Sequence, residues 1–285
     1  MLSAMVDPKN RPTVPFADLE EGDLLGEYEY TLTPEFVDRH RRATDQAPYA
    51  DASLAPVSIL SADGVNLADK FWDISSSVHA AQQIEVLGIP RIGDTLAVKG
   101  YVTEKFVRKG RRYVVSTTTT SDSAGNVLAR GETTGVLVYN EGTEERDEKT
   151  SVASGERGAT ESSSREVGCL SRQMNFEKMV LYEPPGELSI HTSDERAREV
   201  GLPSAIATGT QFMAYVFDLL YQAYGFETIV GTRMHAKIRL PVFAHDLIET
   251  RAWLLAEEEG RLQISARCTS ELGDVIRATA EVPVV

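Results

Sequence analysis

Two parts of the chain share the same pattern, in which long β-branched stretches of alternating apolar and polar residues are separated by short turns. Such a pattern predicts antiparallel strands joined in a meander. The predicted strands cover residues 95–106, 113–120 and 127–139 in the first part and 247–255, 261–269 and 275–284 in the second. Gly125-Asn126 and Gly273-Asp274 occupy matching turns, so we interpret the two parts as one structural unit used twice.

Helical sequence precedes each meander. Residues 211–224 are apolar on nearly every side, which indicates a helix buried on all faces, and Gly225 then ends it. Residues 55–71 are the counterpart in the first part, but Asp63 and Gly64 interrupt the apolar run. A buried helix against an antiparallel sheet is α+β architecture, and the first part holds the more degenerate copy.

A polar stretch separates the two parts. Residues 141–168 are rich in Glu, Ser and Gly and contain few side chains that could pack, which is typical of a flexible linker. We therefore expect a degenerate N-terminal domain over residues 14–140. A C-terminal domain over residues 169–285 would carry the candidate chemistry.

The composition, with 42% hydrophobic and 25% charged residues in a chain of 285, is that of a globular protein. The formal net charge of −14 disfavours nucleic acids and anionic membranes as partners, because their phosphates would be repelled. No apolar run approaches the roughly 20 residues that span a bilayer, and the N-terminal residues lack the apolar core of a signal peptide. We therefore expect a cytoplasmic protein. Cys169 and Cys268 lack metal-ligand spacing, so we expect free thiols and no metal site.

His191 is the main candidate for chemistry. It lies in the segment 189–195, ahead of the point where Gly209 opens the buried helix. An imidazole near the free N–H groups of a helix start suits chemistry on a carbonyl group. Two alternatives stay open: His191 could be an ordinary loop or core histidine, and Gly209 could serve close packing of the helix start against a strand. Thr192 and Glu195 have the spacing of a capping box, so we expect Thr192 to cap a short helix.

Several short segments together resemble a known family. In the second part they are Ile190-His191-Thr192, Ala197-Arg198, Gly201-Leu202-Pro203, Ile206-Ala207-Thr208-Gly209 and Pro241-Val242. In the first part they are Val78-His79-Ala80 and the run from Pro90 to Leu96. These segments are similar to the MaoC-like (R)-specific enoyl-CoA hydratase and 3-hydroxyacyl dehydratase family. The resemblance implies a double hotdog fold, in which two antiparallel sheets each wrap a central helix and pack together as a pseudo-dimer.

The resemblance also implies an activity, the reversible hydration of enoyl thioesters and dehydration of 3-hydroxyacyl thioesters. His191 would be the acid/base, because a neutral imidazole can take a proton from water near neutral pH. Gly209 would offer its N–H to the thioester carbonyl, and Thr208, Thr210 and Gln211 would line the same substrate position. Coenzyme A would enter as part of the substrate, and no separate cofactor is expected.

One element of the family pattern is missing. The family has Asp-x-Asn-Pro-x-His, and at the Asp, Asn and Pro positions this chain has Gly186, Leu188 and Ser189. In the family the aspartate shares the water molecule with the histidine, so a substitute is needed. The carboxylates nearest in sequence are Glu183, Glu187 and Asp194, and we choose Glu187 because it is one position from the missing aspartate.

The missing aspartate leaves two other functions open. The chain could bind acyl thioesters, or serve as a partner subunit, without turnover; or it could be a hotdog thioesterase, which needs a carboxylate on the central helix. The basic turn at Arg108, Lys109 and Arg111 could meet the phosphates of coenzyme A or be an ordinary solvated hairpin. For His79 we favour a structural or interfacial role. We expect a homo-oligomer (a dimer of double hotdogs) or a pseudo-dimeric monomer.

Overall fold

The computed structural model describes residues 11–12, 14, 16–74, 77–137, 164–186, 188–226 and 228–284. Glu187 and most of the predicted linker lie outside the described residues. The end of the linker stretch is described, and it differs from the prediction: strand β6 (Arg165–Gln173) begins inside it. The physical reason is that Val167 packs against the hydrophobic core, which the polar neighbours along the sequence do not reveal.

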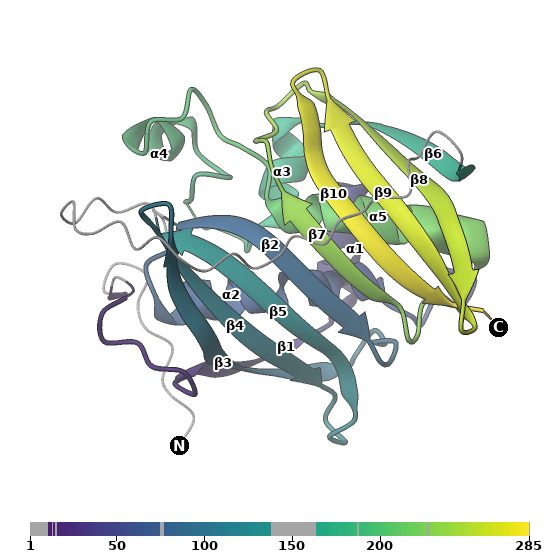
Figure 1. The fold of residues 1–285 in the computed structure, drawn as a ribbon, viewed down its shortest axis with the longest axis horizontal. Helices are drawn as coiled ribbons and strands as arrows, with labels where there is room; N and C mark the ends of the chain where they lie inside the picture. The colour runs from purple at the N-terminus through teal and green to yellow at the C-terminus, as the bar shows by residue number, and fades with distance from the viewer. Residues whose placement is uncertain are drawn as a thin grey trace.

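Ten strands form one antiparallel sheet made of two equivalent halves (Figure 1). The first half has the order β1-β3-β4-β5-β2, and the second half follows in the reversed order β7-β10-β9-β8-β6. The remaining bounds are β1 (Leu24–Thr31), β2 (Ser77–Val86), β3 (Thr95–Arg108), β4 (Arg111–Ser121), β5 (Val127–Leu137), β7 (Arg233–Ile238), β8 (Leu247–Glu258), β9 (Arg261–Ser270) and β10 (Gly273–Pro283). Strands β2 and β7 pair with each other and join the two halves.

Each half has its own central helix. In the second half this is α5 (Gly209–Tyr224), which lies behind the strands in Figure 1. The equivalent in the first half is a 3-10 helix, η2 (Val57–Ala62), continued by α2 (Asp63–Phe71). Helices α1 (Pro34–Thr44) and α3 (Phe176–Tyr182) follow β1 and β6, and the short α4 (Asp194–Glu199) precedes α5. No helix among the described residues is long and apolar enough to cross a membrane.

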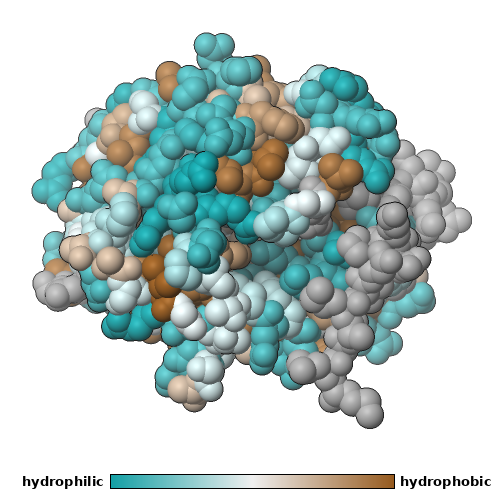
Figure 2. Space-filling view, turned by 180° about the vertical axis from the view of Figure 1, so that it is seen from behind, coloured by the Kyte–Doolittle hydropathy of each residue, from teal (hydrophilic) through white to brown (hydrophobic). Residues whose placement is uncertain are grey.

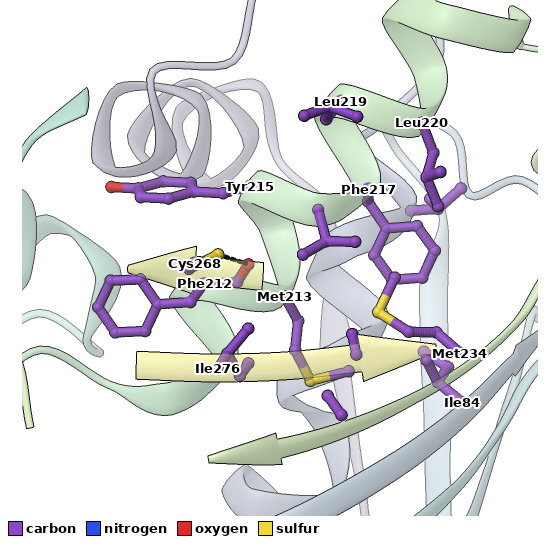
Figure 3. Close-up of a cluster of buried hydrophobic side chains, with 14 of the residues drawn as sticks. Ile84, Phe212, Met213, Tyr215, Phe217, Leu219, Leu220, Met234, Cys268 and Ile276 are labelled. Carbon is purple, nitrogen blue, oxygen red and sulfur yellow. Dashed lines mark hydrogen bonds between the residues drawn. The ribbon is translucent and has the colours of Figure 1, made fainter. Parts of the chain in front are cut away.

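The core of the second half is built on α5. Every residue from Thr210 to Leu220 is buried, in agreement with a sequence that is apolar on nearly every side. Figure 3 shows the α5 side chains beside Met234 of β7, Ile276 of β10 and Ile84 of β2. Because Ile84 belongs to the first half, one hydrophobic core crosses the junction, and the two halves are not independent units of packing.

The interior of the first half contains a carboxyl group. Asp63, the first residue of α2, is 2% exposed and accepts hydrogen bonds from the hydroxyls of Tyr30 (2.9 Å) and Thr120 (2.6 Å). Burial raises the pKa of Asp63 to about 7, since its effect exceeds that of the hydrogen bonds, which lower it. The next residue, Gly64, has no room for a side chain, because a Cβ there would lie only 2.4 Å from Thr133 Oγ1. The polar interruption at 63–64 is therefore a packed part of this helix.

The surface mixes hydrophilic residues with small, separate apolar patches on the face opposite to Figure 1 (Figure 2). Both cysteines are free thiols, Cys169 exposed and Cys268 buried. Burial raises the pKa of Cys268 to about 12, and its sulfur lies 3.3 Å from Thr250 Oγ1. Cys268 is therefore an unreactive core residue that packs against Phe212 of α5 (Figure 3).

Candidate active site

The N-terminal end of α5 is the place where several of the sequence-predicted residues meet. Thr208 precedes the helix with an extended backbone, and no side chain caps the helix there. The first N–H groups of any helix lack partners inside it and carry the positive end of the helix dipole. This helix start can therefore receive an acceptor from outside the helix, such as a carbonyl oxygen.

His191 lies in a loop that is tied to the segment leading into α5. Its Nδ1 is 2.8 Å from the carbonyl oxygen of Ile206, and the N–H of Ile206 donates to the carbonyl of Ile190 at 3.1 Å. A carbonyl can only accept, so Nδ1 carries the proton and Nε2 is the acceptor of the neutral ring. The half-buried His191 is thereby held in the tautomer that a general base at Nε2 requires.

Ser193, and not Thr192, caps α4. Ser193 Oγ accepts from the N–H of Arg196 (3.3 Å), whereas Thr192 Oγ1 accepts from the N–H of Ser189 (2.9 Å). The predicted N-cap is therefore wrong by one position. Ser193 does not form a capping box either, because Arg196, three places later, is basic and cannot accept a hydrogen bond in return. Thr192 instead closes the turn that holds His191.

Glu183 is the described carboxylate at the start of α5. Its Oε1 accepts a hydrogen bond from the hydroxyl of Thr208, and the side chain is half-buried. Burial lowers the pKa of Arg39 on α1, while the negative charge of Glu183 raises it, so this guanidinium and carboxylate lie near each other. Glu183 thus contacts Thr208, the residue before Gly209, and the guanidinium of Arg39 lies near it.

The other two carboxylates considered from the sequence are placed differently. Asp194 accepts from the N–H of Ala205 (2.9 Å) and from Arg198 (3.3 Å), so it holds α4 and the following loop together. Glu187, the preferred substitute, lies outside the described residues, and its role stays a prediction.

Gly209 allows the start of α5 to lie close to strand β7. A Cβ on this residue would be 3.0 Å from Ile238 Cγ1 and 3.5 Å from His79 Nδ1. The close-packing interpretation is thus supported, and it leaves the N–H of Gly209 available for a carbonyl, so the two interpretations are compatible.

Thr210 and Gln211 connect α5 to the neighbouring helices. The hydroxyl of Tyr182 on α3 lies 3.0 Å from Thr210 Oγ1, and Gln211 Nε2 donates to the carbonyl of Ala43 on α1 at 2.7 Å. Both side chains are fully buried. These contacts fix the position of the helix start, while the predicted substrate contacts of the two residues stay predictions.

Comparison with known proteins assigns the fold. No family model matches the sequence, and no curated protein matches it. The chain is similar in structure to a MaoC-like dehydratase, with a TM-score of 0.72 and 16% identity over 91% of this chain and 98% of that one. It is also similar to the MaoC-like dehydratase of Phytophthora capsici, with a TM-score of 0.69 and 15% identity over 95% and 98% of the two chains. A Mycobacterium tuberculosis protein described as having a double hotdog fold gives a TM-score of 0.65 and 10% identity over 95% and 98%. The fold is a double hotdog.

The basic residues predicted to meet coenzyme A lie at the tip of a hairpin of this double hotdog. Arg108 pairs with Arg111, and Lys109 and Gly110 form the two-residue turn between them with φ of 52° and 73°. Positive φ at both turn positions is what a tight hairpin with the right-handed strand twist requires. The turn therefore presents its cations at one end of the first half.

Two surface hollows are lined by none of the predicted site residues. One, of about 440 Å³, is on the β2–β7 junction and is lined by residues such as Gln83, Arg130 and His235. The other, of about 350 Å³, is near the β9–β10 turn beside Arg239 and Asp274. Within the described parts of the chain, no group of three or more His, Cys, Asp or Glu side chains could hold a metal ion.

Two contacts at the start of α5 were not predicted from the sequence. Of the three carboxylates considered, Glu183 is the furthest from His191 along the chain, and only the fold brings it to Thr208. His79 belongs to the first half and reaches Gly209 of the second across the junction. Neither contact has a local signal in the sequence, because both depend on how segments far apart in the chain pack.

Proposed function

We propose that this protein is a hydro-lyase that reversibly hydrates 2-enoyl thioesters and dehydrates 3-hydroxyacyl thioesters. The observation that carries the proposal is the hydrogen bond of 2.8 Å from His191 Nδ1 to the Ile206 carbonyl, which leaves Nε2 as a base. Ile206 is two residues from Thr208, at the uncapped start of the buried helix. The name of the MaoC-like dehydratases that share the double hotdog fold supports the same class of reaction.

The thioester carbonyl would bind at the N-terminal end of α5, with the N–H of Gly209 as a donor. Hydration places developing negative charge on this oxygen as the double-bond electrons move toward it. A fixed N–H donor and the positive end of a helix dipole both stabilise that charge. One such donor typically lowers the barrier by ~3 kcal/mol.

His191 would move the proton. In hydration, Nε2 accepts a proton from water while the water oxygen bonds to the β-carbon of the substrate. The double-bond electrons move onto the carbonyl oxygen, and the proton is then returned to the α-carbon, which restores the carbonyl. The reverse sequence removes water from the 3-hydroxyacyl thioester, so one imidazole serves in both directions.

Glu183 would orient the water that the family's missing aspartate would otherwise hold. Its Oε1 already accepts from Thr208 beside the helix start, and its second oxygen has capacity for a further donor. The guanidinium of Arg39 lies near this carboxylate, because the negative charge of Glu183 raises the pKa of Arg39. Among the described carboxylates Glu183 therefore fits this role better than Asp194, whose two oxygens both bind other groups.

A coenzyme A ester is the expected form of the substrate. The β4–β5–β2 register places Val114, Gly135 and His79 in one row across the sheet. Arg111 lies three residues from Val114 on β4. It is therefore about 10 Å from this row along the strand, and two strand spacings, about 10 Å, separate β4 from His79 on β2. A thioester at α5 thus has a cationic turn within reach of an extended carrier bearing phosphates.

The test compares the wild type with His191→Asn. The amide of asparagine can still donate to Ile206 and keep the loop in place, but it cannot act as a base near neutral pH. We expect turnover of a crotonyl-type thioester, followed by loss of its ultraviolet absorbance, to fall by about 100-fold or more. His235→Gln, in the outer hollow of the sheet, is the matched control and should retain full activity.

Two other results would point to other functions. Release of free coenzyme A, measured with a thiol reagent, would indicate a thioesterase. The structure offers little support for that reaction, because Asp218 on α5 forms a buried ion pair with Arg172. Binding of the thioester with no change in absorbance and no free thiol would indicate a non-catalytic acyl-thioester protein.

A further inference from the structure

His79 of the first half lies against the N-terminal end of α5 in the second half. Its Nδ1 is 3.5 Å from the position that a Cβ on Gly209 would occupy. Both ring nitrogens are shielded from solvent, although the residue as a whole is partly exposed, and neither has a hydrogen-bond partner of good geometry within the described part of the chain; the backbone of Ala81 is a nearby polar group. A buried polar atom without a partner destabilises the fold, so its presence beside a helix start requires an explanation.

A β-bulge turns His79 toward the helix. The register between β2 and β5 shifts between His79, which opposes Gly135, and Ala81. Because side chains alternate along a regular strand, His79 would otherwise share the outer face of Ala81. The extra residue moves it to the inner face, which it shares with the buried Gln82. Gly135 has no side chain to fill the space opposite the imidazole.

The ring of His79 is neutral at physiological pH. Burial lowers the pKa of His79 to about 4, an effect larger than that of the nearby Ala81 backbone, which raises it. A neutral imidazole carries one N–H donor and one acceptor nitrogen. It can therefore donate a hydrogen bond at the start of α5 without bringing a positive charge next to the positive end of the helix dipole.

We propose that His79 is a second catalytic histidine, whose Nδ1–H donates a hydrogen bond to the thioester carbonyl oxygen at the start of α5. This inference rests on the proposed hydro-lyase function and names a further residue of the same site. His79 keeps its proton throughout: no bond to it forms or breaks, and it stabilises the oxygen while the double-bond electrons reside there. The water proton passes only through His191.

The two histidines then divide the chemistry between the two halves of the double hotdog. The second half supplies His191, which moves the proton, and the helix start that binds the carbonyl. The first half, which lacks an uninterrupted central helix, supplies His79 through its strand β2. The active site is thus complete only when both halves are folded together, as the shared core across β2 and β7 ensures.

The test uses two substitutions of His79 in the full chain. His79→Leu keeps most of the volume but removes the donor, whereas His79→Asn places an amide N–H near the position of Nδ1. We expect kcat for enoyl thioester hydration to fall about 100-fold in the leucine variant, as for loss of an oxyanion donor, and to recover to within about tenfold of wild type in the asparagine variant. KM and the affinity for a saturated acyl-CoA should change little, because the lost interaction strengthens mainly in the transition state.

Each possible result has one meaning. An active wild type with an unchanged leucine variant would overturn the role of His79 while leaving the hydro-lyase function intact. Equal losses in the leucine and asparagine variants, or a lower thermal midpoint that accounts for the loss, would make His79 a structural residue. A wild type that binds acyl-CoA but hydrates no enoyl thioester would overturn the proposed function itself, and this inference with it. His235→Gln again serves as the control.

Discussion

Replacing Asp63 by Asn should raise the stability of the protein above neutral pH and flatten its dependence on pH. Burial raises the pKa of Asp63 to about 7 in the folded protein, from an ordinary value of 3.8. Between these values the folded protein binds a proton that the unfolded chain has released, so the free energy of unfolding falls as pH rises. A difference of about three in pKa corresponds to about 4 kcal/mol, all of which is lost once the pH is above the folded pKa.

Asparagine has the shape of the protonated aspartate but no proton to lose. Its amide can still pair with the hydroxyls of Tyr30 and Thr120, which both contact Asp63. His40 and His79 contribute the opposite slope at acidic pH, because burial lowers their pKa values to about 3 and about 4 and only the unfolded chain takes up their protons there. The difference between the variant and the wild type therefore isolates Asp63.

The assay is urea unfolding of both proteins at several pH values from 5 to 9, followed by circular dichroism and by tryptophan fluorescence to check that the transition is two-state. The gap in unfolding free energy should widen in favour of the variant as pH rises, by a few kcal/mol in total. Asp38→Asn, at an exposed position on α1, should leave the wild-type slope unchanged. Two parallel curves for wild type and Asp63→Asn would show that burial does not raise the pKa of Asp63 in the folded protein.

Two further predictions concern packing inside each half. Arg172 and Asp218 form a buried ion pair, with the guanidinium 4.7 Å from the ring centre of Tyr215. Arg172→Met alone should lower the unfolding free energy by about 3–5 kcal/mol, because it leaves the charge of Asp218 buried and unpaired. Combining it with Asp218→Leu should restore most of that loss. Equal losses in the single and double variants would show that the unpaired charge is not the cause. Gly64→Ala should lower the unfolding free energy by about 1–3 kcal/mol, because its Cβ would meet Thr133 Oγ1 at 2.4 Å. Adding Thr133→Ala should recover the lost stability. A double variant as unstable as Gly64→Ala alone would show that this clash is not the cause.

The strands of the two meanders and the buried helix could be predicted because their signals are local. The ends of the six predicted strands agree with the structure to within three residues, and α5 begins two residues before the predicted helix. Strands β1, β2, β6 and β7 were not predicted. Strands β1 and β6 form the two edges of the sheet, and β2 and β7 join its two halves, so the conformation of all four depends on partner strands distant in the sequence.

The candidate site was predictable only in part. His191 and Gly209 could be singled out because a histidine before a glycine-initiated apolar helix is visible along the chain. The contact of Glu183 with Thr208 could not, because it depends on how segments far apart in the chain pack. Distance along the sequence favoured Glu187 instead, and that criterion does not measure distance in space.

The duplication, the α+β class and the histidine loop therefore follow from the sequence, since alternation, periodicity and turn residues act over a few neighbours. Which side chains share the start of α5 depends on how distant segments pack. His79 faces the helix because a bulge shifts β2 against β5, and it meets Gly209 because β2 and β7 pair across the junction. A register shift of one residue reverses the face of a side chain, and the sequence of one strand alone cannot fix it.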